Sequence, residues 1–132
     1  MRRALAAGAL AGQVSGAPST AYALATGRDP LEATLAAGSL LLPGETRQGR
    51  LLLAAGPVHL AISLGWALLL QRALPRRPTL LAGALAGLGI AALDMGVVGR
   101  RFPRIRALPL LPQLADHALY GATVAAVLRG RT

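Results

Sequence analysis

The chain has 132 residues and carries 14 basic against 5 acidic side chains, which gives a formal net charge of +9 at pH 7. It is 54% hydrophobic and only 14% charged, whereas roughly a quarter of a soluble domain is charged. Because the chain has no Cys, disulfide exchange, thiolate catalysis and Cys-ligated zinc or iron–sulfur sites are excluded. The length fits one domain, and we predict a single transmembrane domain over residues 1–132.

The basic residues are all Arg and gather at the ends of apolar stretches, as membrane-flanking anchors do. We therefore expect a multi-pass protein of the cell membrane with the lipid bilayer as its partner and no nucleic acid. These residues are Arg2, Arg3, Arg28, Arg47, Arg50, Arg72, Arg76, Arg77, Arg100, Arg101, Arg104, Arg106, Arg129 and Arg131.

Four apolar stretches reach the roughly 20 residues that a spanning helix needs. They predict an all-α polytopic bundle of four helices, plus one short interfacial or re-entrant helix. The four stretches cover residues about 4–26, 51–70, 79–99 and 107–128.

The first stretch can be interpreted in two ways. Its basic start and the Ala21-Tyr22-Ala23 triplet are typical of a signal peptide that is cleaved. Gly8, Gly12 and Gly16 instead recur every four residues and form a smooth face for helix packing, which favours a retained helix. Pro18 is expected to kink that helix and to free a backbone carbonyl near Ser19 and Thr20.

A short helix is predicted over residues 30–42, with Asp29 as N-cap, Pro30 in the first turn and Glu32 as the capping-box partner. At 1.5 Å per residue it extends about 20 Å, which is too short for a hydrocarbon core of about 30 Å. A tilted fifth span that continues to Arg50 is the alternative. Glu45 is expected to pair with Arg47 or Arg50.

Two features bear on symmetry. Residues 7–12 recur letter for letter as residues 82–87, which indicates either a parallel internal repeat or chance in a chain rich in Ala, Gly and Leu. With four spans, each side of the membrane carries seven arginines, so the positive-inside rule gives no orientation. The tie leaves open both a single orientation and a dual topology, in which opposed copies form a homo-oligomer.

The strongest polar residues of the apolar stretches are His59, Asp94, Asp116 and His117. Counted at 1.5 Å per residue, all four lie about 8–15 Å from the same side, at the depth of Ser19 and Thr20. Tyr120 is one helical turn from Asp116 and shares its face. We predict an intramembrane polar site of these seven residues, next to the basic loop of Arg100, Arg101, Arg104 and Arg106.

Each of these residues also has a purely structural explanation. His59 can be bonded across helices as a neutral ring, and Asp94 can pair with an Arg of the adjoining loop. Asp116 can be stabilised by the dipole at the start of its own helix.

Several functions could use such a layer. An ion or small-molecule transporter would use the Asp and His side chains as carriers. His59 and His117 could ligate haem b, and with Asp94 they could hold a divalent metal, although no helical ligand motif supports either. A lipid-head-group enzyme would need a catalytic pattern that the sequence lacks. We therefore expect a structural or accessory membrane protein without a cofactor, and an enzyme is disfavoured.

The four-span layout and small size resemble the small multidrug-resistance and fluoride-channel classes in architecture only. The layout and the run from Asp116 to Gly121 (Asp-His-Ala-Leu-Tyr-Gly) also resemble small bacterial membrane proteins grouped as domains of unknown function. That second resemblance covers the chain loosely and implies no activity.

Overall fold

The computed structural model describes residues 1–130, and every regular element within them is helical, which confirms the all-α prediction. Arg131, which was counted among the terminal arginines, lies outside the described residues. The elements are α1 (Arg2–Val14), α2 (Ala17–Thr26), α3 (Glu32–Ser39), α4 (Gln48–Ala73), α5 (Leu80–Leu93), the π-helix η1 (Asp94–Val98), the 3-10 helix η2 (Gly99–Arg101), α6 (Pro103–Arg106) and α7 (Leu110–Arg129).

Two helices of the described chain are long and apolar enough to cross a membrane, by length and composition alone. They are α4 and the continuous helix Leu80–Arg101, which joins α5, η1 and η2. Only 28% and 22% of their most apolar windows are buried, whereas the core helix of a soluble protein would be mostly buried. Of the four predicted spans, the second and third therefore meet this criterion.

The first predicted span is two helices, not one. The chain breaks at Ser15 and Gly16, and Pro18 lies in the first turn of α2. A proline ring clashes with the carbonyl four residues earlier, so a break just before Pro18 is the expected effect of this residue. The kink predicted from Pro18 is confirmed, with the break on its N-terminal side.

The predicted short helix exists but is shorter, and its predicted capping is wrong. It begins after Leu31 and ends at Ser39. The Asp29 carboxylate accepts the Leu31 N–H at 2.9 Å, while the Glu32 carboxylate accepts from Arg28 Nε at 2.9 Å. Glu32 therefore forms an ion pair with the preceding turn and does not close a capping box.

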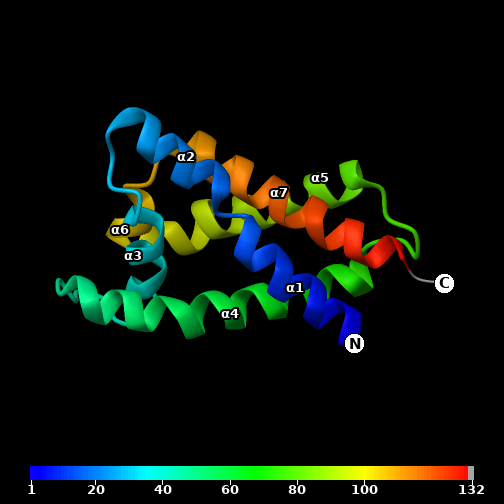
Figure 1. Cartoon of the computed structure of the whole chain (residues 1–132). Coiled ribbons are helices and arrows are strands. Elements are labelled where there is room, and N and C mark those ends of the chain that lie inside the picture. The colour runs from blue at the N-terminus through cyan, green and yellow to red at the C-terminus, as the bar shows by residue number, and fades with distance from the viewer. Residues whose placement is uncertain (131–132) are drawn as a thin grey trace.

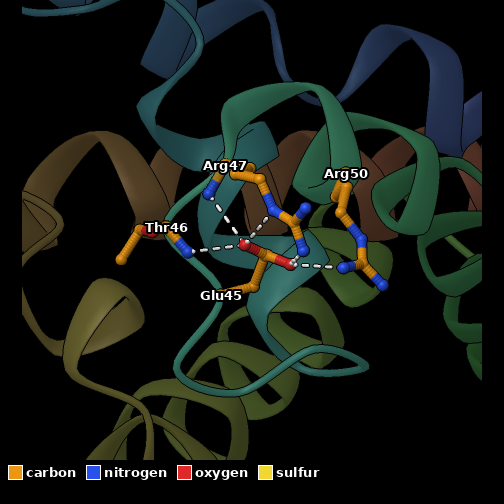
Figure 2. Close-up of polar contacts among 4 residues, drawn as sticks. All are labelled: Glu45, Thr46, Arg47 and Arg50. Carbon is orange, nitrogen blue, oxygen red and sulfur yellow. Dashed lines mark hydrogen bonds and ion pairs between the residues drawn. The ribbon is translucent and has the colours of Figure 1, made fainter.

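The predicted pairing of Glu45 is confirmed for both arginines. Figure 2 shows its carboxylate between Arg47 Nε, at 3.2 Å, and Arg50 Nη1, at 3.2 Å. The same carboxylate accepts the backbone N–H groups of Thr46 and Arg47, at 3.0 and 2.9 Å. Glu45 therefore fixes the loop that leads into α4.

Small residues bring the helices into close contact in two antiparallel pairs. In α1, Gly8 and Gly12 pack against Ser63 of α4, and Gly8 also meets Ala67. In α5, Gly83 packs against Gly121 and Ala125 of α7, and Gly87 against His117. These four glycines are the ones in the hexapeptide that occurs twice in the sequence. In each copy the two glycines are four residues apart, and both contact the same partner helix.

The two ends of the molecule differ. At one end an apolar cluster joins α1, α4, α5 and α7, and there Arg3 Nη1 donates to the Gly130 carbonyl, so the start of α1 and the end of α7 lie together (Figure 1). At the other end α3 and α6 lie beside each other (Figure 1). The cluster consists of Ala7, Ala11, Ala67, Leu70, Ile90, Tyr120, Val124 and Leu128.

Candidate functional site

The half of the molecule next to α3 and α6 contains a cavity of about 720 Å³ that is partly open to the surface. Helices α1, α2, α3, α4, α6 and α7 and the α5–η1 segment all contribute to its lining. All seven residues of the predicted polar layer line it: Ser19, Thr20, His59, Asp94, Asp116, His117 and Tyr120. The structure thus brings the scattered polar residues of the sequence around one space.

Asp94 and His117 form a pair across α5 and α7, with 3.0 Å between Oδ2 and Nε2. The other ring nitrogen of His117, Nδ1, lies 2.7 Å from the Gln113 carbonyl and must donate to it, because a carbonyl only accepts. Nε2 and Oδ2 therefore share one proton, and the pair has zero net charge whichever atom carries it. The expected pairing of Asp94 with a loop arginine is wrong.

Asp94 is also the first residue of the π-helical turn η1. A π-turn inserts one extra residue into a helix and is found frequently at functional sites. Apart from Asp94 the sequence of this stretch is apolar, and its pattern does not indicate a π-turn.

Asp116 interacts with the N-terminus of a different helix from the one expected. Its Oδ1 accepts the backbone N–H of Ser19 at 2.8 Å, in the first turn of α2. A helix N-terminus has unpaired N–H groups and a positive dipole end, so it stabilises a carboxylate. The break before Pro18 thus frees an N–H that Asp116 satisfies, while the start of α7 lies a turn and a half away, at Leu110.

Two further contacts tie α4 to its neighbours. His59 Nε2 lies 2.7 Å from the Gly12 carbonyl of α1, so the expected bond across helices is confirmed. Tyr120 donates its hydroxyl to the Ser63 carbonyl. Each of these side chains reaches a backbone group that lies at the cavity wall.

Three polar residues that sequence reasoning missed complete the cavity. Ser15, Ser63 and Gln113 are 6%, 4% and 7% exposed, and all three line the cavity. Within the described residues, none of these three side chains forms a hydrogen bond. Every fully buried side-chain N or O atom there does have a partner, so the polar atoms of these three side chains are not fully buried. Their polar atoms are therefore open to the cavity. Gln113 and Ser63 lie four residues from His117 and His59, a spacing that could have indicated them.

The four arginines of the basic loop do not line this cavity, although Ile105 between them does. Arg100, Arg101, Arg104 and Arg106 are exposed, and Arg104 lines a smaller hollow with Arg28 and Glu32. No group of three or more His, Asp or Glu side chains in residues 1–130 is arranged to hold a metal. Both ring nitrogens of His117 are engaged, so a haem at this residue would have to displace Asp94 or the Gln113 carbonyl.

No protein-family model, curated protein or solved structure matches this chain. The geometry of the cavity is therefore the basis of the functional argument.

Proposed function

We propose that the chain is a multi-pass integral membrane protein that binds a small molecule in an intramembrane cavity. The binding role replaces the purely structural or accessory role that the sequence favoured. The observation that carries it is the cavity of about 720 Å³ with nearly buried polar side chains that have no protein partner.

Large exposed apolar side chains support the membrane location. A soluble monomer exposes few contiguous apolar patches, and water penalises them. Here the outward faces of α4 and of the helix Leu80–Arg101 carry several, including Leu53 at 80% and Leu81 at 69% exposed. At 1.5 Å per residue the 26-residue α4 extends about 39 Å and the 20-residue α7 about 30 Å, so both match a hydrocarbon core of about 30 Å.

In this proposal the kinked pair α1–α2 and the helix α7 are the remaining two spans. They pack against α4 and α5 along the glycine contacts and complete a four-span layer. Small residues at such contacts are typical of helices that associate in lipid, because they let backbones approach closely.

The polar lining supports binding over a purely structural role. Buried polar groups are nearly always hydrogen-bonded, and a helix bundle that serves only as a scaffold fills its interior with apolar side chains. A space of this size falls in the range of small-molecule sites. The cavity is lined by polar atoms that a ligand or water has to hydrogen-bond, and these belong to Ser15, Ser63 and Gln113.

Cysteine labelling tests this proposal, because the chain has no Cys of its own. In membranes, a small water-soluble thiol reagent is expected to modify Ser63→Cys and Gln113→Cys, which open to the cavity. The control Val124→Cys lies in the apolar cluster, fully buried, and is expected not to react. Equal protection of all three positions would indicate a solid interior and a structural role. Release of the chain by alkaline carbonate would contradict the membrane location.

A further inference from the structure

The cavity has an excess of hydrogen-bond acceptors. His59 Nε2 has to donate to the Gly12 carbonyl, and Nδ1, which is an acceptor whenever it carries no proton, has no partner in the described residues. Asp94 uses Oδ2 for His117 and keeps Oδ1 free. Ser63 and Gln113 can both donate and accept. A ligand that donates hydrogen bonds therefore fits this lining better than one that only accepts.

The cavity also provides little uncompensated charge. Asp94 and His117 together are neutral, and the Asp116 carboxylate lies against the N-terminus of α2. None of the arginines of residues 1–130 lines the cavity. An anionic head group would have no cationic partner there, and a cationic one would meet carboxylates whose charge is already balanced by His117 or by the N-terminus of α2. The balance favours an uncharged head group.

The remaining lining is apolar and continues to the outer surface. Leu60 and Ile62 of α4 line the cavity and are 48% and 39% exposed, so they connect it with the surface that we assign to lipid. Helix α4 packs against α1, α3 and α7, whereas neither α2 nor α5 packs extensively against it. The exposed lining residues Leu60 and Ile62 thus provide an apolar path beside α4 along which a hydrocarbon chain could lie.

We propose that the cavity binds a single-chain amphiphile from the bilayer, whose uncharged head group donates hydrogen bonds through hydroxyls. The head group lies among Ser63, Gln113 and His59, and its chain leaves beside α4 along Leu60 and Ile62. This inference rests on the proposed binding function and names the class of ligand.

Trp66 provides the measurement, since it lines the cavity and is the only Trp in the chain. The protein in phosphatidylcholine nanodiscs is titrated with a monoacylglycerol whose chain carries two bromines, which quench indole fluorescence on contact. Saturable quenching is expected. A brominated fatty acid and a brominated alkylamine of equal chain length carry an anionic and a cationic head group, and both are expected to bind at least about tenfold more weakly.

Variants separate head-group contacts from simple hydrophobic partition. Each of Gln113→Leu and Ser63→Ala removes hydrogen bonds to the head group, and we expect about three- to tenfold weaker monoacylglycerol binding. The matched control is Thr123→Val on α7, whose hydroxyl bonds to the Leu119 carbonyl and does not line the cavity. Its binding curve is expected to match that of the unmodified protein.

The outcomes distinguish the two proposals. Tighter binding of the fatty acid or the alkylamine overturns the uncharged head group, and so does equal binding by all variants. If no probe quenches Trp66 above the lipid background while Ser63→Cys still reacts, the amphiphile proposal fails and the binding cavity stands. If Ser63→Cys is also unreactive, both proposals fail.

Discussion

Oδ2 of Asp94 and Nε2 of His117 are 3.0 Å apart, and within the described residues these two atoms bond only to each other. Because one proton is shared between Nε2 and Oδ2, neither side chain has to be charged in a low-dielectric surrounding. Burying an unpaired charge is far more costly than burying a neutral hydrogen-bonded pair. The pair thus lets two ionisable groups line the cavity at modest cost.

Two substitutions of Asp94 distinguish the effect of its charge from the effect of its hydrogen bond. Asp94→Asn keeps a donor for His117 Nε2, so its free energy of unfolding in detergent is expected to stay near that of the unmodified protein. Asp94→Ala leaves Nε2 without a partner and is expected to cost about 1–3 kcal/mol. Thermal or denaturant unfolding measures both. Equal losses in the two variants would show that the pair requires an ionised carboxylate.

Glu45 lies outside the apolar helices, and its hydrogen bonds predict that the stability of the fold depends on pH. The side-chain and backbone hydrogen bonds from Arg47 lower the pKa of this carboxyl from 4.5 to about 2. A carboxyl whose pKa is lowered by folding stabilises the fold above its ordinary pKa, and this stabilisation is lost as the pH falls toward the folded value.

We therefore expect Glu45→Gln to be less stable than the unmodified protein at pH 6, with a difference that shrinks between about pH 4.5 and 2. Unfolding curves at several pH values give the comparison. Because the group is near the surface, the difference at pH 6 should also decrease in high salt. A difference that is independent of pH would contradict the assigned role of the carboxylate.

At the scale of the helices, glycine determines which elements touch. A Cβ at Gly87 would overlap the His117 carbonyl, whereas a Cβ at Gly89, two residues along α5, meets no atom within 4 Å. The same helix thus has one face that cannot accept a side chain and one that can. This difference makes the α5–α7 contact specific.

Gly87→Ala is expected to destabilise the protein by about 1–3 kcal/mol, because the helices must separate to make room. Gly89→Ala is the matched control and should be neutral or stabilising by up to about 1 kcal/mol, since Ala is the better helix former. Both are measured by unfolding in the same detergent. A destabilised Gly89→Ala would mean that this face of α5 contacts another surface, such as a second copy.

Sequence reasoning predicted the elements better than their contacts. The helical character of the apolar stretches, the effect of Pro18 and the pairing of Glu45 follow from local rules, and the structure agrees with them, although only two of the four predicted spans meet the membrane-span criterion. The partners of Asp94 and Asp116 depend on how helices face one another, which a count of depth along each helix does not contain. Pro57 lies inside α4 without ending it, although a proline usually breaks a helix.

The sequence predicted that seven polar residues lie at one depth, but it did not predict the cavity or its other polar lining residues. Depth along the chain placed the seven polar residues together, whereas Ser15, Ser63 and Gln113 are uncharged and inconspicuous among apolar neighbours. Their significance follows from burial without a partner, and burial depends on tertiary packing.

At the scale of the whole molecule, the positions of the start of α1 and the end of α7 predict the topology in the membrane. Arg3 donates to the Gly130 carbonyl, and the start of α1 and the end of α7 lie at the same end of the molecule (Figure 1). Reporter domains fused to either terminus are therefore expected to report the same side of the membrane. In a dual topology both fusions would report both sides in the same proportion. Termini on opposite sides would contradict an even number of spans.

The shared proton has a consequence for how the chain enters the membrane. If the chain is multi-pass as proposed, a helix Leu80–Arg101 released alone into lipid would expose the Asp94 side chain without its hydrogen-bond partner, and an Asp inside such a helix costs up to about 2.5–3.5 kcal/mol on insertion. His117 removes this cost only once α7 lies against α5. During biosynthesis we therefore expect the insertion machinery to retain the helix Leu80–Arg101 until α7 has been made. The two helices would then enter the lipid together as a hairpin.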